Sequence, residues 1–148
     1  MGSVSIILPA KNEAENLVLL LPKLRAAQPE AEIIVVDDGS SDNTVAVCAA
    51  AGVRCVSHPY SMGNGAAIKT GARNASHDVL MFMDADGQHD PAAIQPLLDK
   101  LEQGYEMAVG ARTWDSHASL GRRAANYVYN HLASYMAGRP VLDLTSGF

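Results

Sequence analysis

Two acidic residues, Asp84 and Asp86, follow an apolar run at positions 79–83. The run is too short for a helix and predicts a strand buried on both faces. Because side chains alternate along a strand, the two carboxylates should point the same way at its carboxyl end, where open α/β sheets bind ligands. Paired carboxylates favour a divalent cation, and their oxygen atoms suit Mg²⁺ or Mn²⁺ shared with substrate phosphates. The alternative is a solvated turn whose acids are incidental.

A second pair of acids, Asp37 and Asp38, follows the apolar run 33–36. Gly39 comes next and permits a tight turn, and Ser41 or Asp42 can cap the helix that follows. Two acid-rich strand ends in one small domain indicate a single shared site.

Buried runs alternate with helical patterns along the whole chain. We expect strands at 4–8 (stopped by Pro9), 33–36, 54–57, 79–83 and 107–110. The first helix should begin after Asn12, a candidate N-cap, and should bury four leucines with i, i+3, i+4, i+7 spacing: Leu17, Leu20, Leu21 and Leu24. This alternation predicts a three-layer α/β fold with a mostly parallel sheet.

The later helices begin at recognisable signals. A glycine-rich stretch at 63–71 should open one helix, where small residues allow close backbone approach and Lys69 could reach a phosphate. Its glycines match neither the dinucleotide fingerprint nor the P-loop. Another helix should start near Pro91 and bury Ile94, Leu97, Leu98 and Leu101, and a last one should start at Leu120.

Length and composition predict one domain over residues 1–148. Residues 1–111 carry an excess of acids, whereas 112–148 carry four Arg against two Asp. This basic end suits a polyanionic ligand or an anionic membrane surface.

Cys48 and Cys55 fit no metal spacing and are expected to be buried thiols of a reducing compartment. With no signal peptide or membrane-spanning run, we expect a cytoplasmic protein. If its acceptor is a lipid, the protein would bind peripherally at the cytosolic face of a membrane.

Five segments occur in an order that resembles the family 2 glycosyltransferases, and among them the polyprenyl- and dolichol-phosphate sugar transferases. The segments are residues 8–13, 36–42, 63–66 with Lys69, 84–88, and Asp143 with 146–148. The resemblance implies a GT-A fold and transfer of a sugar, with inversion, from a nucleotide-diphosphate donor such as GDP-mannose or a UDP-sugar. A divalent cation, Mg²⁺ or Mn²⁺, would neutralise the leaving diphosphate.

The resemblance also implies roles for individual residues. Positions matching the nucleoside site are Pro9, Ala10, Glu13 and Asp38. Asp84 matches an acid that contacts the donor, and Asp86 and Gln88 match metal ligands. Arg112 and Arg122 fall near positions that meet phosphates. Asn12, Gly39, Lys69 and Ala85 lie in the matching segments and are expected in the same substrate site.

The acceptor implied by the resemblance is a polyprenyl or dolichyl phosphate. A lipid phosphate is already ionised and needs little general base, whereas a hydroxyl acceptor would need one, for which Asp143 is the candidate. We therefore expect Asp86 and Asp143 to be the catalytic residues. The family pattern continues beyond Phe148 with a basic residue, so we expect a truncated catalytic domain with an incomplete acceptor side. No nucleic-acid partner is expected, and oligomer contacts could cover that side.

Two other functions compete with this one. The first is a phosphatase of the haloacid dehalogenase type, whose nucleophile loop resembles residues 84–87; that family, however, places the nucleophile strand first and its acid pair late. The second is a nucleotide-sugar-binding chain that transfers nothing. Phosphatase turnover without a sugar nucleotide would favour the first, and donor binding without transfer or hydrolysis would favour the second.

Overall fold

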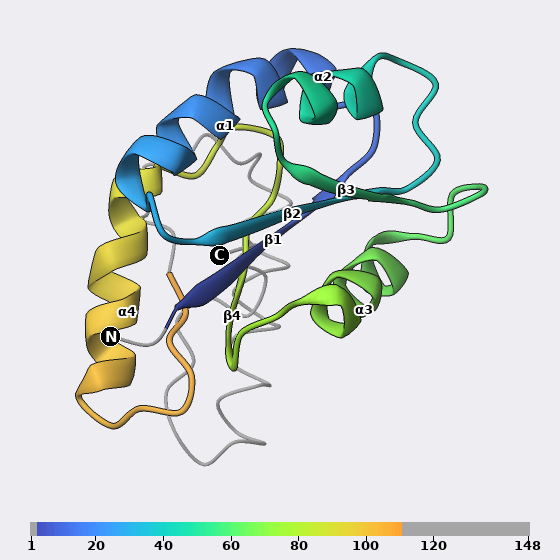
Figure 1. Ribbon diagram of the computed structural model, residues 1–148. Coiled ribbons are helices and arrows are strands. Elements are labelled where there is room, and N and C mark those ends of the chain that lie inside the picture. Colours follow the sequence, from blue (N-terminus) through green and yellow to red (C-terminus); the bar gives the residue numbers. More distant parts are fainter. Residues whose placement is uncertain (1–2, 111–148) are drawn as a thin grey trace, which may run out of the picture.

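The structure, a computed structural model, describes residues 3–110, which form an α/β unit. Strands and helices alternate in the following order: β1 (Val4–Ala10), α1 (Ala14–Ala27), β2 (Glu32–Asp37), α2 (Thr44–Ala50), β3 (Arg54–Ser57), α3 (Asn64–Asn74), β4 (Val79–Phe82), the 3₁₀ turn η1 (Pro91–Ala93) and α4 (Ile94–Glu102). The expected three-layer α/β architecture is confirmed (Figure 1). The helix expected from Leu120 lies outside the described residues.

The described strands form one sheet in the order β3-β2-β1-β4, and every pair is parallel. The carboxyl ends of all four strands therefore meet at one edge. After β3 the chain returns to the other side of β1 to form β4, so the direction of winding reverses between β1 and β4. In open α/β sheets, ligands bind in the crevice at such a reversal.

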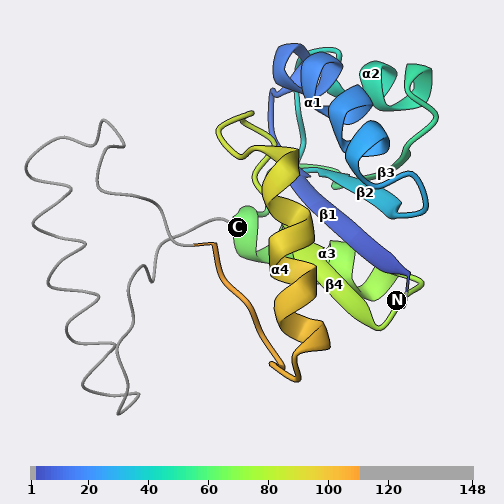
Figure 2. The same cartoon turned by 90° about the vertical axis from the view of Figure 1, so that its left-hand side faces the viewer.

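Helices cover both faces of the sheet (Figures 1 and 2). On one face α1, α2 and α4 pack against the larger core cluster, which includes all four leucines expected to be buried in α1. Of the residues expected to face the core in α4, Ile94 and Leu98 are buried, and Leu97 and Leu101 pack at the edge of the same cluster. On the other face α3 packs on Ile7, Ile34 and Val36.

Pro9 does not stop β1, contrary to expectation. The strand continues to Ala10, and Pro9 pairs in register with Val36. The N–H of Met83 donates to the carbonyl of Ile7, at the point where β4 has ended. Since the backbone groups of alternate residues in a strand face opposite neighbouring strands, the nitrogen of Pro9 faces the β4 side of β1, beyond the last residue of β4. Proline is tolerated there because no ladder hydrogen bond is lost.

One further strand prediction is wrong, and the strand expected at 79–83 is present as β4 but is less buried than expected. Residues 107–110 form no strand, and Met107 and Val109 are exposed. Alternating apolar residues become a strand where a neighbouring backbone supplies hydrogen bonds, and within the described residues this segment has no such ladder. β4 is also less enclosed than expected: Met81 is buried, but Val79, Leu80 and Phe82 are half-buried. It lies at the edge of the described sheet, next to β1 alone.

The two cysteines are unpaired thiols. Cys48 is fully buried in α2, as expected, whereas Cys55 in β3 is half-buried. No helix within residues 3–110 combines the length and apolar character needed to cross a membrane.

Candidate functional site

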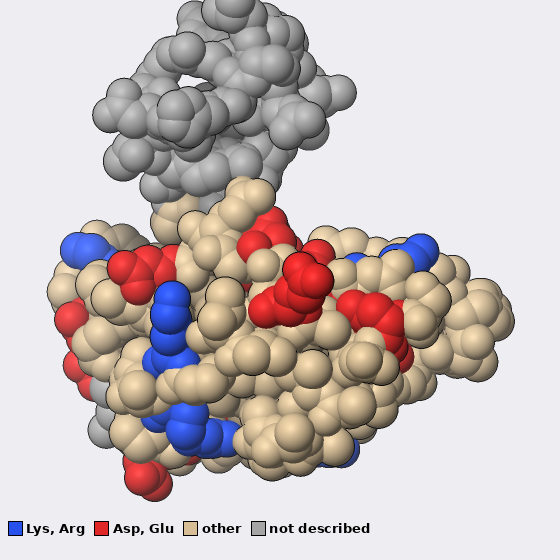
Figure 3. Space-filling view, turned by 90° about the horizontal axis from the view of Figure 1, so that it is seen from above, with Lys and Arg blue, Asp and Glu red and all other residues tan. Residues whose placement is uncertain are grey.

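The site expected from the sequence lies at the carboxyl edge of the sheet, where four loops follow the four parallel strands. Sheet order places them side by side: the β3–α3 loop, the β2–α2 loop, the β1–α1 loop and the loop after β4. The first three are joined by hydrogen bonds between their own residues. Figure 3 views the molecule from the side of α1 and α2, where Asp and Glu side chains gather in several groups.

The β1–α1 loop is held by hydrogen bonds with the neighbouring β2–α2 loop. Asn12 is not the N-cap expected from the sequence; it adopts a left-handed backbone with φ of 57°, and Glu13 precedes the helix. The Asn12 side chain instead accepts a hydrogen bond from the backbone N–H of Ser41, at 2.8 Å, and the Ser40 hydroxyl accepts one from the Asn12 N–H, at 2.9 Å. The two loops therefore hold each other.

Asp42 supplies the missing helix cap across this junction. Its Oδ2 accepts from the N–H of Ala14 at the start of α1, at 3.0 Å, and its Oδ1 accepts from both the N–H and the hydroxyl of Thr44 at the start of α2, at 3.0 and 2.6 Å. The hydrogen bond from the Thr44 hydroxyl contributes most to lowering the pKa of Asp42. One carboxylate thus serves the first turns of two helices, where negative charge is also favoured by the helix dipoles.

Asp38 is the centre of the junction between the β2–α2 and β3–α3 loops. Its Oδ1 accepts from the His58 ring, at 2.7 Å, and from the N–H of Met62, at 2.7 Å. Its Oδ2 accepts from the hydroxyl of Ser61, at 2.8 Å, and from the N–H of Gly63, at 2.9 Å. Asp38 as a whole residue is 5% exposed. Both of its oxygens therefore carry two hydrogen bonds from one loop.

These contacts set the charge of Asp38. Burial acts to raise its pKa, but the hydrogen bonds from the His58 ring and the loop that follows outweigh burial and hold the pKa well below the ordinary value. Gly39 allows the loops to approach, because a Cβ at this position would lie 2.8 Å from the backbone nitrogen of Ser61, and its φ is +70°. The Lys11 amine also donates to the Ser61 hydroxyl, at 3.0 Å, so the β1–α1 loop joins the same cluster.

The acidic loop after β4 differs from the expected strand end. β4 ends at Phe82, and Asp86 lies in a turn, so the two acids are not successive residues of one strand face. Asp84 is the first of them, with its side chain 44% exposed and one oxygen 3.9 Å from Nε2 of His89. Asp86 accepts from the N–H of Gln88, at 2.9 Å. Ala85 between them is buried at 2% exposure and anchors the loop in the core.

Asn16 connects this loop with the start of α1. Its amide donates to the Glu13 carboxylate, at 2.6 Å, and its Oδ1 would lie 3.9 Å from a Cβ placed on Gly87. Glu13 and the acidic loop therefore lie on either side of Asn16. Asn16 was not among the residues expected in the site, although its position about one helical turn after Glu13 was an available signal.

The metal-binding expectation can be tested against the donor atoms present. Of the two expected ligands, Asp86 is half-buried and Gln88 is exposed, and their oxygens are hard donors of the kind Mg²⁺ and Mn²⁺ prefer. Within residues 3–110 no group of three or more His, Cys, Asp or Glu side chains could by itself hold a metal ion. Such cations are commonly held by one or two carboxylates together with waters and substrate phosphates, so the residues fit a site that a phosphate ligand completes.

The remaining expected residues are distributed as follows. Ala10 is buried and its carbonyl accepts from the N–H of Asp38, at 2.8 Å, while Pro9 precedes it in β1. Lys69 is exposed and lies about one and a half turns into α3. Arg112, Arg122 and Asp143 lie outside the described residues.

His58 is a residue of the site that the sequence pattern did not reveal. The residue is 9% exposed, and its ring is bonded on both nitrogens, to Asp38 and to Thr70. A lone histidine after a short strand gives no periodic signal, so its burial depends on contacts that form only in the folded chain.

Comparison with protein families identifies the chain. The model of Glycosyl transferase family 2 matches residues 5–147, nearly the whole sequence. This chain belongs to glycosyl transferase family 2. The family assignment overrules the phosphatase alternative, and the predicted resemblance is confirmed.

The names of several curated relatives refer to undecaprenyl phosphate or to polyprenol monophosphomannose. The chain is 34% identical over 150 residues to the undecaprenyl-phosphate 4-deoxy-4-formamido-L-arabinose transferase of Photorhabdus laumondii, covering 95% of this chain and 46% of the relative. It is 31% identical over 160 residues to the polyprenol monophosphomannose synthase of Mycolicibacterium smegmatis, covering 97% of this chain and 59% of that protein. The chain thus spans about half the length of these relatives.

Solved structures of the same fold support the architecture. The glucosyl-3-phosphoglycerate synthase of Mycobacterium tuberculosis superimposes with a TM-score of 0.76 at 26% identity, over 99% of this chain and 55% of that one. A structure of this synthase with Mn²⁺ and UDP-glucose matches with a TM-score of 0.76 at 25% identity, over 99% of this chain and 54% of that one. The fold is the GT-A fold of this family, as expected.

Proposed function

We propose that this chain forms the donor-binding part of an enzyme that transfers a sugar, with inversion, from a nucleoside diphosphate sugar to a polyprenyl phosphate. The observation that carries the proposal is the convergence of four loops at the β1–β4 reversal within a family 2 chain. The loop after β4, which carries Asp84 and Asp86, meets Asn16, whose amide donates to Glu13. The junction around Asp38 lies at the same edge of the sheet. The printed activities of the curated relatives support the acceptor class.

The nucleoside would lie against the junction of the first three loops. This junction is lined or supported by Pro9, Ala10, Asn12, Glu13, Asp38 and Gly39. Hydrogen bonds hold the three loops together in the absence of a ligand. A preformed site loses little conformational entropy on binding, which favours affinity. The diphosphate would lie towards Asp84 and Ala85, with Lys69 as a candidate partner for a phosphate oxygen.

A divalent cation, Mg²⁺ or Mn²⁺, would be held by Asp86 and Gln88 and would neutralise the charge that develops on the leaving diphosphate. The structurally similar glucosyl-3-phosphoglycerate synthase has been solved with Mn²⁺ and UDP-glucose, which supports a divalent cation as cofactor. The contact between the Asp86 carboxylate and the Gln88 N–H keeps the loop folded back on itself, so both residues stay on the same turn. Arg112, Arg122 and Asp143 remain predicted partners of the phosphates and the acceptor, and contact with a membrane surface follows if the acceptor is a lipid.

Calorimetric titration of the chain with UDP and with GDP, each with Mn²⁺ and with EDTA, tests the proposal. We expect one nucleotide to bind, and to bind more tightly with the metal. Asp86→Asn keeps an acceptor for the Gln88 N–H but removes the charge, and it should abolish the metal-dependent gain in affinity. Asp99→Asn, at an exposed position of α4, is the matched control and should bind like the wild type.

Three outcomes would count against the proposal in different ways. Full metal dependence in Asp86→Asn would remove the metal role of Asp86. Absence of binding for both nucleotides would contradict the donor site. Donor binding without transfer of labelled sugar to a polyprenyl phosphate would favour a binding function for this chain.

A further inference from the structure

His58 links the acidic edge of the sheet to helix α3. Its Nδ1 lies 2.7 Å from Oδ1 of Asp38, and its Nε2 lies 2.8 Å from the hydroxyl oxygen of Thr70. An ionised carboxylate can accept hydrogen bonds but not donate them, so Nδ1 must carry the proton that joins the ring to Asp38. The hydroxyl of Thr70 can donate or accept and therefore satisfies Nε2 in either state of the ring.

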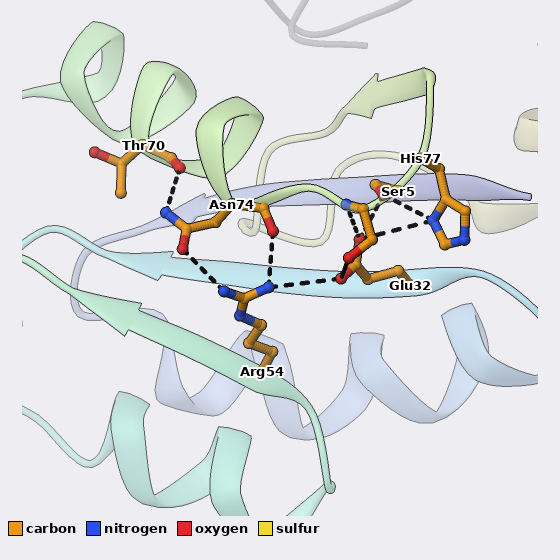
Figure 4. A network of polar contacts seen from close by, with 7 residues as sticks. Ser5, Glu32, Arg54, Thr70, Asn74 and His77 are labelled. Atoms are coloured by element: carbon orange, nitrogen blue, oxygen red, sulfur yellow. Dashed lines mark hydrogen bonds and ion pairs between the residues drawn. The ribbon is translucent and has the colours of Figure 1, made fainter.

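The contact with Thr70 fixes the middle of α3, which spans Asn64–Asn74. Further along α3, the carbonyl of Thr70 accepts from the Asn74 amide, at 2.9 Å, and the Asn74 side chain accepts from Arg54, at 2.9 Å (Figure 4). Arg54 lies 3.7 Å from Glu32 at the amino end of β2. Polar contacts therefore tie α3 to both ends of the sheet, with Thr70 in both sets of contacts.

The contact with Asp38 fixes the loop between β3 and α3. All four hydrogen bonds to this carboxylate come from residues 58–63, two to each oxygen. A carboxylate offers about four lone-pair positions, so its direction is fully determined by this loop. Without the ring of His58, one of these positions and the hydroxyl of Thr70 would both lose a buried partner.

We propose that His58 is a positioning residue for nucleotide binding, acting through Asp38 and Thr70. The ring holds the Asp38 carboxylate and the middle of α3 in one arrangement, and so shapes the nucleoside side of the site without touching the ligand. This inference rests on the proposed function for its ligand, but the arrangement itself can be measured without any ligand.

His58→Ala and Thr70→Val each break one side of this link, and Thr70→Ser retains the hydroxyl. His77→Ala is the matched control, because His77 also lies near a carboxylate, with its Nδ1 3.7 Å from Glu32, but at the amino end of the sheet (Figure 4). The first readout is hydrogen exchange of the backbone amides of Met62 and Gly63, which donate to Asp38. The second is the dissociation constant for the nucleotide that the wild type binds.

We expect His58→Ala to speed exchange at Met62 and Gly63 while amides in β2 keep their protection, and to weaken nucleotide binding about tenfold, as expected for the loss of a buried hydrogen-bonded contact. Thr70→Val should act in the same direction with a smaller effect, and Thr70→Ser should restore binding. His77→Ala should leave both readouts within about twofold of the wild type.

Unchanged exchange at Met62 and Gly63 in a folded His58→Ala variant would overturn the inference, and so would faster exchange with unchanged affinity. If His58→Ala does not fold, the comparison of Thr70→Val with Thr70→Ser decides the same question. If the wild type binds no nucleotide, the proposed function fails and the ligand part of this inference fails with it, whereas the exchange result still decides whether His58 holds the loop.

Discussion

The backbone of Gly71 in α3 lies directly against the side chain of Ile7 in β1. A Cβ added at position 71 would overlap Cγ2 of Ile7, and Cγ2 of Val36 would be 3.2 Å away. Both side chains are fully buried in the centre of the sheet. The close packing of α3, which carries Thr70 and the turn after Gly63, therefore depends on the absence of a side chain at this position.

Gly71→Ala should consequently destabilise the protein although alanine favours helices. Overpacking a well-packed core costs about 1–3 kcal/mol, and neither neighbour can move into solvent. Gly65→Ala is the matched control, since nothing lies within 4 Å of a Cβ there and its backbone lies in the same helix. The control should be neutral or stabilising by up to about 1 kcal/mol. Chemical denaturation of both variants measures the difference, and equal free energies of unfolding would contradict the packing argument.

Asp42→Ala should loosen the starts of α1 and α2 together. The variant leaves the N–H groups of Ala14 and Thr44 without their side-chain acceptor, although the two helices are far apart in sequence. We expect a lower melting temperature and faster amide exchange at both positions. Asp99→Ala removes an exposed acid that bonds within α4 and should change neither. Faster exchange at Thr44 alone would show that the contact between the loops is dispensable.

Acidification should destabilise the fold through buried or bonded carboxylates. The pKa of Asp38 lies well below its ordinary value because hydrogen bonds outweigh burial, and Glu32 is shifted in the same direction because hydrogen bonds from Ser5 and Ser76 outweigh its burial. A folded-state pKa below the unfolded one stabilises the protein above the unfolded pKa, near 4, and this contribution is lost as the pH falls towards the folded pKa.

The free energy of unfolding, measured from pH 7 to pH 3, should therefore fall below about pH 4.5. Asp38→Asn should be less stable at pH 7, because the amide nitrogen cannot accept from Ser61 and Gly63. The same variant should show a shallower loss of stability with acid, since the titrating group is gone. A slope equal to that of the wild type would show that Asp38 is not a source of the acid sensitivity.

The sequence by itself determined the order of strands and helices, the leucine face of α1 and the acidic loops at the carboxyl ends of strands. These features depend on local periodicity and on residue types that act over a few positions. The five motif segments, in their order along the chain, were also sufficient to predict glycosyl transferase family 2 and the GT-A fold.

The tertiary structure alone decided how those loops meet. Asn12 reads locally as a helix cap, but its side chain bonds Ser41, and Asp42 takes over the cap from 28 residues away. Pro9 reads as a strand breaker, yet it is tolerated where β4 has ended. His58 gains its role when Asp38 and Thr70, 20 residues before it and 12 after it, close around the ring. Such partners are brought together by strand order and helix packing, which no local pattern of residues contains.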